Sequence, residues 1–330
     1  MQNFEFTDVH VKDELYETLD ESQILFLINS LKIKKEIPHK YSFIGQGAQC
    51  WDEAYKQQSR SITYGTSEEQ ELLDITINSL SKYIANYDAV NVIDIGSGNF
   101  APAYPTVLRM EKANKLNKYI CIDISKSIIE ITKSKFCLDF PIEKFESHIL
   151  DIEINSIQND LFANQKDPKC INIFLLLGGT IGNIENQVQF HNHIYNGMNP
   201  DDILIVANRF DDINGRNIFP SFQSTEGKGK ILLIAKMLNL ETEMYSEELI
   251  YNSENGYREF NIIFNQDINI HFDKNDVSIY IKKGESINIC RHKRDTFESI
   301  VQKMKEAEMN LLMIFKQPIT SQIIYVVKSL

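Results

Sequence analysis

Glycines and acidic residues follow three consecutive apolar stretches of the sequence, where they could hold a nucleoside. The first stretch runs into Asp94-Ile95-Gly96-Ser97-Gly98, and glycines at such a turn let the backbone approach a ligand closely. Asp123 ends the next stretch, about 25 residues after Gly98, near the spacing of an acid that binds ribose hydroxyls. Asp151 follows the third stretch, where a carboxylate could accept a hydrogen bond from the adenine amino group. Together these residues predict a site for an adenosyl group.

The first glycine turn leaves other interpretations open when it is taken alone. A dinucleotide-binding loop would carry a third glycine, and Ala101 stands at that position. An NAD-dependent oxidoreductase is therefore an alternative that NAD binding would support. A tight strand-to-helix turn that holds no ligand is another.

A second glycine cluster follows the most apolar stretch of the chain. It reads Leu177-Gly178-Gly179-Thr180-Ile181-Gly182-Asn183. Three glycines within five residues at the end of a strand indicate that the backbone passes close to another group. A purely structural bend is the alternative interpretation.

The elements that must position these residues alternate between strands and helices from residue 90 to residue 208. Such alternation predicts parallel strands that are buried on both faces and bind ligands at their carboxyl ends. We expect strands over 90–95, 119–124, 147–150, 170–177 and 203–208, and helices over 102–115, 125–136 and 185–198.

Different patterns come before and after this block. Apolar spacing predicts helices over 13–31 and 68–87, and after residue 210 the alternation over 257–272 and 277–289 is typical of antiparallel strands. We expect helices over 228–240 and 296–307 as well, and closing strands over 311–315 and 322–327. The expected parts are an N-terminal helical segment over 1–85 that contributes to a cap, a Rossmann-like core over 86–212 and 291–330, and an inserted cap over 213–290.

Several pieces of the sequence match one family when they are taken together. They are Tyr64-Gly65-Thr66-Ser67-Glu68-Glu69-Gln70-Glu71-Leu72, Asp94 to Gly98, Asp123-Ile124-Ser125, Asp151, and Gly178-Gly179-Thr180-Ile181-Gly182-Asn183. The block around them resembles the histidine-specific Nα-methyltransferases, known from ergothioneine biosynthesis, with fungal relatives that act on a prenylated tryptophan. The resemblance implies an α/β fold with a Rossmann-like class I methyltransferase sheet and an inserted α+β substrate-binding cap. It also implies S-adenosyl-L-methionine as the donor, amino-acid N-methylation, and a role in secondary metabolism.

The resemblance also implies which residues bind the two substrates. Tyr64 and Asn183 match the tyrosine and asparagine that grip the carboxylate and amine of the amino acid. For Tyr64 the alternative is a packing role, and Asn183 could instead cap the helix expected from Glu185. The residues expected to hold the donor are Gly96, Ser97, Gly98, Asp123, Ile124, Asp151, Ile152, Gly178 and Gly179.

Three further positions bear on the substrate. Another tyrosine of the family falls near Phe43, with Tyr41 two residues away. The glutamate and serine that recognise imidazole in the histidine enzymes align with Cys290 and His292. A pocket built to hydrogen-bond one ring loses its preference when those groups change, so we expect an amino acid or derivative other than histidine.

The composition excludes several other classes of function. A formal net charge of −12 argues against sequence-independent nucleic-acid binding, and no apolar run is long enough to span a membrane. Five cysteines without CxxC spacing suggest a reducing, cytoplasmic compartment and no structural zinc. We expect no metal, and a monomer or weak homo-oligomer whose partner is a small amino-acid-like molecule. A protein that binds S-adenosylmethionine without catalysis remains the alternative to an enzyme.

Overall fold

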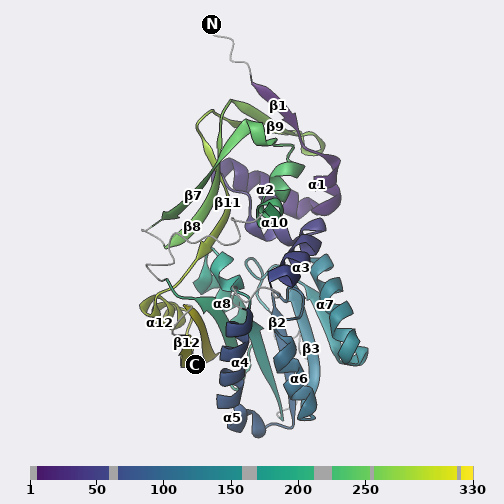
Figure 1. The fold of residues 1–330 in the computed structure, drawn as a ribbon, viewed down its shortest axis with the longest axis vertical. Helices are drawn as coiled ribbons and strands as arrows, with labels where there is room; N and C mark the ends of the chain where they lie inside the picture. Colours follow the sequence, from purple (N-terminus) through teal and green to yellow (C-terminus); the bar gives the residue numbers. More distant parts are fainter. Residues whose placement is uncertain are drawn as a thin grey trace. The chain divides into compact units, whose positions relative to one another are not determined.

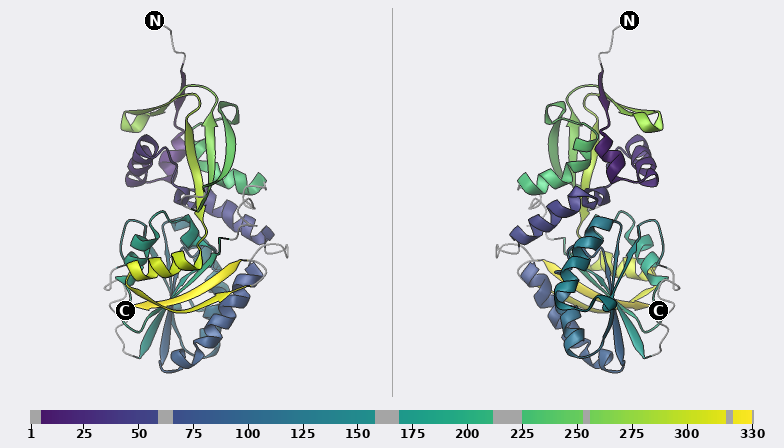
Figure 2. Two further views of the ribbon diagram at one scale, coloured as in Figure 1. Left: turned by 90° about the vertical axis from the view of Figure 1, so that its left-hand side faces the viewer. Right: turned by 90° about the vertical axis from the view of Figure 1, so that its right-hand side faces the viewer.

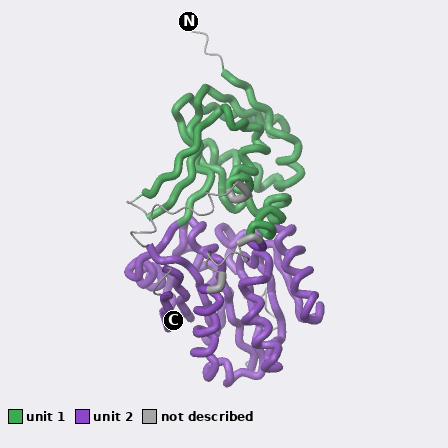
Figure 3. Tube along the Cα trace, in the orientation of Figure 1, with its two compact units in different colours: residues 1–54, 214–292 green, residues 55–213, 293–330 purple. Residues whose placement is uncertain are grey.

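The chain divides into two compact units, each assembled from two separate segments (Figure 3). Unit 1 comprises residues 1–54 and 214–292, and unit 2 comprises residues 55–213 and 293–330. The computed structural model describes residues 6–58, 66–157, 169–211, 225–252, 256–317 and 321–329. The first boundary lies at residues 54 and 55 and not near residue 85, because the helices over 66–85 pack their apolar sides into the core of unit 2.

Unit 2 is built on a seven-stranded sheet with the order β12-β13-β6-β5-β2-β3-β4 (Figure 1). The strands β4, β3, β2, β5 and β6 are mutually parallel, whereas β13 is antiparallel to both β6 and β12. The strand bounds are β2 (Ala89–Ile95), β3 (Leu116–Asp123), β4 (Phe145–Ile149), β5 (Cys170–Leu176), β6 (Ile203–Arg209), β12 (Met309–Lys316) and β13 (Gln322–Ser329). This is the Rossmann-like α/β sheet that the alternating pattern predicted.

The central strands are apolar along their whole length because both faces of the sheet are covered. Side chains alternate between the two faces of a strand, so each strand contributes to two cores. In β5, Ile173 and Leu175 belong to one core, and Phe174 and Leu176 belong to the other. The helices lie on both sides of the sheet accordingly (Figure 2).

The helices of unit 2 are amphipathic, and each turns its buried side toward one of these cores. One face of the sheet is covered by α4 (Thr66–Ser79), α5 (Ser81–Ala85), α6 (Tyr104–Lys112) and α7 (Lys126–Asp139). The other face is covered by α8 (Gln187–Tyr195) and α12 (Phe297–Glu306). Two short 3-10 turns, η2 (Ile142–Lys144) and η4 (Thr180–Asn183), complete the described part of the unit.

Unit 1 combines helices with two three-stranded sheets, of order β1-β9-β10 and β11-β8-β7. The strands are β1 (Thr7–His10), β7 (Tyr245–Asn252), β8 (Tyr257–Phe264), β9 (Ile268–Phe272), β10 (Val277–Ile281) and β11 (Ser286–Lys293). The helices are α1 (Asp13–Thr18), α2 (Glu21–Ile33), α3 (Gln46–Gln58), which runs across the boundary, α10 (Thr225–Ile231) and α11 (Leu233–Met237). The 3-10 turns are η1 (His39–Phe43), η6 (Thr242–Met244) and η7 (Asp273–Asn275).

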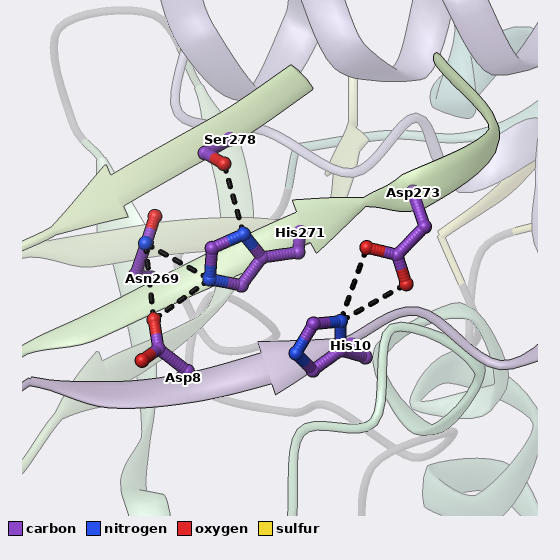
Figure 4. A network of polar contacts seen from close by, with 6 residues as sticks. All are labelled: Asp8, His10, Asn269, His271, Asp273 and Ser278. Atoms are coloured by element: carbon purple, nitrogen blue, oxygen red, sulfur yellow. Dashed lines mark hydrogen bonds and ion pairs between the residues drawn. The ribbon is translucent and has the colours of Figure 1, made fainter. Parts of the chain in front are cut away.

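A network of exposed polar side chains connects β1 with β9, although the two strands are far apart in the sequence (Figure 4). Nδ1 of His10 lies 2.9 Å from a carboxylate oxygen of Asp273, and Nε2 of His271 lies 2.7 Å from Oδ1 of Asp8. The two imidazole rings stack with their centroids 4.8 Å apart. The parallel pairing of β1 is a long-range contact that local spacing did not indicate.

Several predicted elements have different ends in the structure. The helix expected over 68–87 is divided at Leu80 into α4 and α5, and the helix expected over 228–240 is divided into α10 and α11. The strand expected over 147–150 begins earlier, at Phe145, because it pairs along β3 from Tyr119 onward. Within the described ranges, no helix is both long and apolar enough to cross a membrane.

Candidate active site

The two glycine clusters follow neighbouring parallel strands at the point where the strand order reverses. The chain continues from β2 to β3 on one side, whereas β5 lies on the other side of β2. In sheets of this kind, the crevice outside the carboxyl ends of those two strands binds ligands. Gly96 and Gly98 follow β2 with φ values of +64° and +57°, and Gly178 and Gly179 follow β5 with φ values of +68° and +74°.

The two glycine loops contact each other closely. A Cβ atom built on Gly96 would lie 3.0 Å from Cγ2 of Thr180, so the side chain of Thr180 would have to shift slightly to admit it. A Cβ atom built on Gly178 would meet no atom within 4 Å, so the space beside Gly178 is open. Glu69 on α4 also holds the Gly178 loop, because its Oε1 accepts a hydrogen bond from the backbone N–H of Gly178 at 3.0 Å.

Asp123 lies beside the first glycine loop at the end of β3. It is buried, and its Oδ1 accepts a hydrogen bond from the backbone N–H of Ser125 at 2.9 Å. Burial raises the pKa of Asp123 to about 7, although backbone N–H groups of Ser125, Gly98 and Ile124 act in the opposite direction. The carboxylate that the sequence assigned to a ribose is therefore next to the glycine loop.

Asp94 is a second buried carboxyl group at this end of the sheet. Its Oδ2 accepts a hydrogen bond from the hydroxyl of Tyr119 at 2.6 Å. Burial raises the pKa of Asp94 to about 7, and the charge of Asp123 contributes in the same direction. Asp94 therefore lies among the buried side chains on the α6 and α7 side of the sheet.

The residues after β4 combine a polar and an apolar surface. Asp151 is half-buried, and its Oδ1 accepts a hydrogen bond from the backbone N–H of Glu153 at 3.1 Å. Ile152 is buried within the core on the α8 side, and Ile124 is half-buried directly after Asp123. The backbone N–H of Leu150 donates to the carbonyl of Asp123 at 3.0 Å, which brings the two acidic segments side by side.

The hydroxyl of Ser97 points into the core of unit 2. The hydroxyl is buried, 3.0 Å from Sγ of Cys121 and 3.2 Å from Oγ1 of Thr132. These partners lie on β3 and α7, so the side chain of Ser97 joins the glycine loop to the core. Only its backbone remains available for the donor contact that was expected at this position.

Asn183 lies at the end of η4, directly after the second glycine cluster, and is half-buried. The capping role considered for it belongs to Asn186, whose side chain accepts a hydrogen bond from the backbone N–H of Gln189 at 3.0 Å. The amide of Asn183 is therefore not used as the cap of α8. Tyr64 lies outside the residues that the structure describes.

The three substrate positions expected in unit 1 lie around a lysine that the sequence did not single out. Nζ of Lys230 lies 4.5 Å from the centroid of the Phe43 ring. Cys290 acts on the pKa of Lys230, and His292 acts on the pKa of His39, so these groups share one neighbourhood. Lys230 is on a short helix that shows no motif, and only the fold of unit 1 places it beside η1 and β11.

The sequence matches the model of one known protein family. The model for histidine-specific, S-adenosylmethionine-dependent methyltransferases matches residues 12–329. The chain belongs to this family. It is therefore an S-adenosylmethionine-dependent methyltransferase, as the resemblance of its motifs indicated.

The glycine loops and Asp123 fit the donor of this methyltransferase family. S-adenosylmethionine carries a ribose whose hydroxyls need a hydrogen-bond acceptor, and Asp123 supplies a buried carboxyl group at the end of β3. The open space beside Gly178 and the left-handed glycines let the backbone run close to a bulky ligand.

Several solved structures resemble the chain loosely. An S-adenosylmethionine-dependent methyltransferase from Clostridium acetobutylicum ATCC 824 shares 11% identity over 84% of this chain and 97% of that chain, with a TM-score of 0.47. The PH0226 protein from Pyrococcus horikoshii OT3 shares 12% identity over 79% and 91% of the two chains, with a TM-score of 0.45. The glycopeptide N-methyltransferase MtfA, complexed with S-adenosyl-L-methionine, shares 8% identity over 81% and 88%, with a TM-score of 0.40. These scores are below 0.5, so the assignment depends on the family match and on the sheet topology. No curated protein matches the sequence.

Proposed function

We propose that this methyltransferase transfers methyl groups to the α-amino nitrogen of a free amino acid or amino-acid derivative other than histidine. The observation that carries the proposal is the position of Asn183. Its half-buried amide directly follows the glycine loop that packs against Gly96, so an amine held by Asn183 lies on the donor side of the sheet. The catalytic residues in this proposal are Asn183 and Tyr64, which together grip the amine and carboxylate.

The donor is held by the carboxyl ends of β2, β3, β4 and β5. Asp123 accepts hydrogen bonds from the ribose hydroxyls, and Asp151 accepts one from the adenine amino group. Ile124 and Ile152 provide apolar surface for the adenine ring. The backbones of Gly96, Ser97, Gly98, Gly178 and Gly179 run along the remainder of the donor.

The chain contributes position and hydrogen bonding to the reaction. When bound, the donor would supply an electrophilic methyl carbon on a sulfonium, with the thioether as the leaving group. Asn183 would accept a hydrogen bond from the amine through its carbonyl oxygen and orient the nitrogen for the transfer. The amine must be neutral to attack, and water is a sufficient acceptor for its proton.

The exclusion of histidine depends on what surrounds the substrate side chain. Cys290 is buried with Ile289 beside it on β11, and its thiol is a weak hydrogen-bonding group. Cys290 and His292 stand where a glutamate and a serine recognise imidazole in the histidine enzymes. A site that lacks those partners leaves an imidazole unpaired, which lowers its preference for histidine strongly.

Incubation of the purified chain with S-adenosylmethionine and a panel of amino acids, read by mass spectrometry, tests the proposal. We expect a mass increase of one or more methyl groups on the α-nitrogen of a non-histidine substrate. The Asn183→Ala variant should keep donor binding and lose turnover. Methylation of histidine in preference to all others would contradict the specificity. Donor binding without product from any amino acid would favour a binding protein over an enzyme.

A further inference from the structure

A group of side chains in unit 1 surrounds one positive charge. We name it the Lys230 cluster, and its members are Lys230 on α10, His39 and Phe43 on η1, and Cys290 and His292 on β11. The sequence assigned Phe43, Cys290 and His292 to the substrate, whereas Lys230 and His39 join them only in the folded chain. Lys230 and His39 are not among the residues that we propose to hold the donor or the α-amine.

Lys230 is a half-buried cation that pairs with no acidic side chain in the described part of the chain. Its Nζ lies over the face of Phe43, 4.5 Å from the ring centroid, which is a cation–π contact. Among the described residues, no carboxylate lies within ion-pairing distance of this nitrogen. Lys228, two residues earlier on the same helix, shows the usual alternative, because its Nζ lies 2.6 Å from Glu247. Burial lowers the pKa of Lys230 to about 8, so the group is still mostly protonated near neutral pH.

His39 adds a polar atom that the protein leaves unused. Its Nδ1 is buried and has no hydrogen-bond partner among the described residues. The imidazole packs edge-on against Phe43, with the ring centroids 5.1 Å apart. Burial lowers the pKa of His39 to about 3, and Lys230 and His292 contribute in the same direction. The ring is therefore neutral and can donate from one nitrogen while it accepts at the other.

The neighbouring groups that the structure describes do not supply a negative charge to Lys230. The carboxylate of Glu36 forms an ion pair with Arg291, so these two charges balance each other. Burial raises the pKa of the Cys290 thiol to about 12, so the thiol stays protonated. A cation in partly apolar surroundings that lacks a counter-charge is costly unless a ligand provides one.

We propose that the Lys230 cluster is a binding site for a carboxylate, and that its ligand is a small acid such as an acidic amino acid. One carboxylate matches the single charge of Lys230, and His39 can donate a second hydrogen bond to it. A phosphate monoester would carry close to two charges and favours arginine, and Arg291 is already paired with Glu36.

The first experiment compares matched ligands by calorimetric titration of the full chain. Glutamate and aspartate are compared with glutamine and asparagine, which have the same shapes without the charge, and with O-phosphoserine. We expect the affinity for an acidic amino acid to exceed that for its amide by about 10- to 100-fold, as a charged hydrogen bond predicts. Lys230→Met should remove that preference and leave donor affinity unchanged. Lys228→Met is the matched control and should retain the preference.

A second measurement keeps the inference separate from the proposed function. Glutarate has two carboxylates and no amine, so its binding to the full chain does not require methylation. We expect calorimetry to show that glutarate binds the wild type, and that its affinity is at least 10-fold lower in both Lys230→Met and Lys230→Gln. That result would support the anion site, even if no amino acid is methylated. Equal affinity for acids and amides would overturn the inference. So would a higher affinity for O-phosphoserine, or glutarate binding that the Lys230 variants leave unchanged.

Discussion

At the residue scale, Gly178 and Gly284 offer a direct test of what the second glycine loop does. Both have a left-handed backbone, with φ values of +68° and +85°, and a Cβ atom on either would meet no atom within 4 Å. An alanine at either position should therefore cost about 1–2 kcal/mol in the free energy of unfolding. Only Gly178 follows β5 at the carboxyl edge of the sheet.

We predict that Gly178→Ala weakens S-adenosylmethionine binding about 10-fold or more, because its methyl group enters space used by the donor. Gly284→Ala should lose similar stability and keep the donor affinity of the wild type. Calorimetric titration, together with urea denaturation of both variants, measures the two effects. Unchanged affinity in Gly178→Ala would show that the loop is only a structural bend.

Asp123 should make binding of the adenosyl group depend on pH. Its pKa in the ligand-free chain is raised to about 7 by burial, and only the ionised carboxylate can accept from both ribose hydroxyls. Affinity should therefore rise as pH increases through 7, by about 10-fold between pH 6 and pH 8, following the ionised fraction. Methylthioadenosine is the suitable probe, because it lacks the titratable α-amine and carboxylate of the full donor.

Variants at two positions separate this effect from general changes with pH. In Asp123→Asn the dependence should disappear and binding should be weak at every pH. Glu130→Gln changes an exposed carboxylate on α7 and should reproduce the wild-type profile. A wild-type affinity that falls between pH 6 and pH 8 would refute the assignment of the ribose to Asp123.

At the scale of elements, α12 is attached to the sheet of unit 2 through buried charges. Nζ of Lys303 lies 2.6 Å from Oδ2 of Asp295, and the two side chains are only 10% and 0% exposed. Asp295 also accepts hydrogen bonds from Ser299 and from Asn208 on β6. These contacts return the last segment of the chain to the core.

Breaking this ion pair should destabilise unit 2 strongly. Lys303→Met leaves Asp295 buried without its partner, and we predict a loss of about 3–5 kcal/mol in the free energy of unfolding. Lys305→Met, on the exposed side of the same helix, should change it by less than about 0.5 kcal/mol. Chemical denaturation of both variants provides the comparison. Equal stability of the two would mean that the buried pair contributes little to the attachment of α12.

At the scale of the whole molecule, the donor should stabilise one compact unit more than the other. Every residue expected to hold the donor belongs to unit 2, and each unit has its own buried core. Donor at 100 times its Kd stabilises the state that binds it by about 2.7 kcal/mol.

We predict that amides of β2 and β5 exchange hydrogen up to about 100-fold more slowly with saturating S-adenosylhomocysteine, whereas amides of β8 and β9 keep their rates. Hydrogen exchange read by mass spectrometry resolves the two groups of strands. Equal slowing in both would show that the units unfold as a single cooperative body.

The local sequence was sufficient to predict the sheet of unit 2 and its family. Strands that are buried on both faces are apolar along their length. A left-handed backbone favours glycine, because other residues are strained there. Both features are therefore visible in short stretches of the sequence. Asp123 and the Gly178 loop were singled out in this way as candidate donor-binding residues. The alternation after residue 210 also indicated antiparallel strands, although not their partners.

The tertiary structure alone decided which residues meet across long distances in the chain. Lys230 lies against Phe43, and β1 pairs with β9. These contacts depend on packing between distant segments, and such packing follows no fixed spacing in the sequence. Neighbouring elements likewise decide that the Ser97 hydroxyl points into the core. They also decide that Asn186, and not Asn183, caps α8. Sequence alone indicated the residues that we propose for the donor, since the backbone demands of glycine turns are local. The Lys230 cluster depends on contacts that only folding creates.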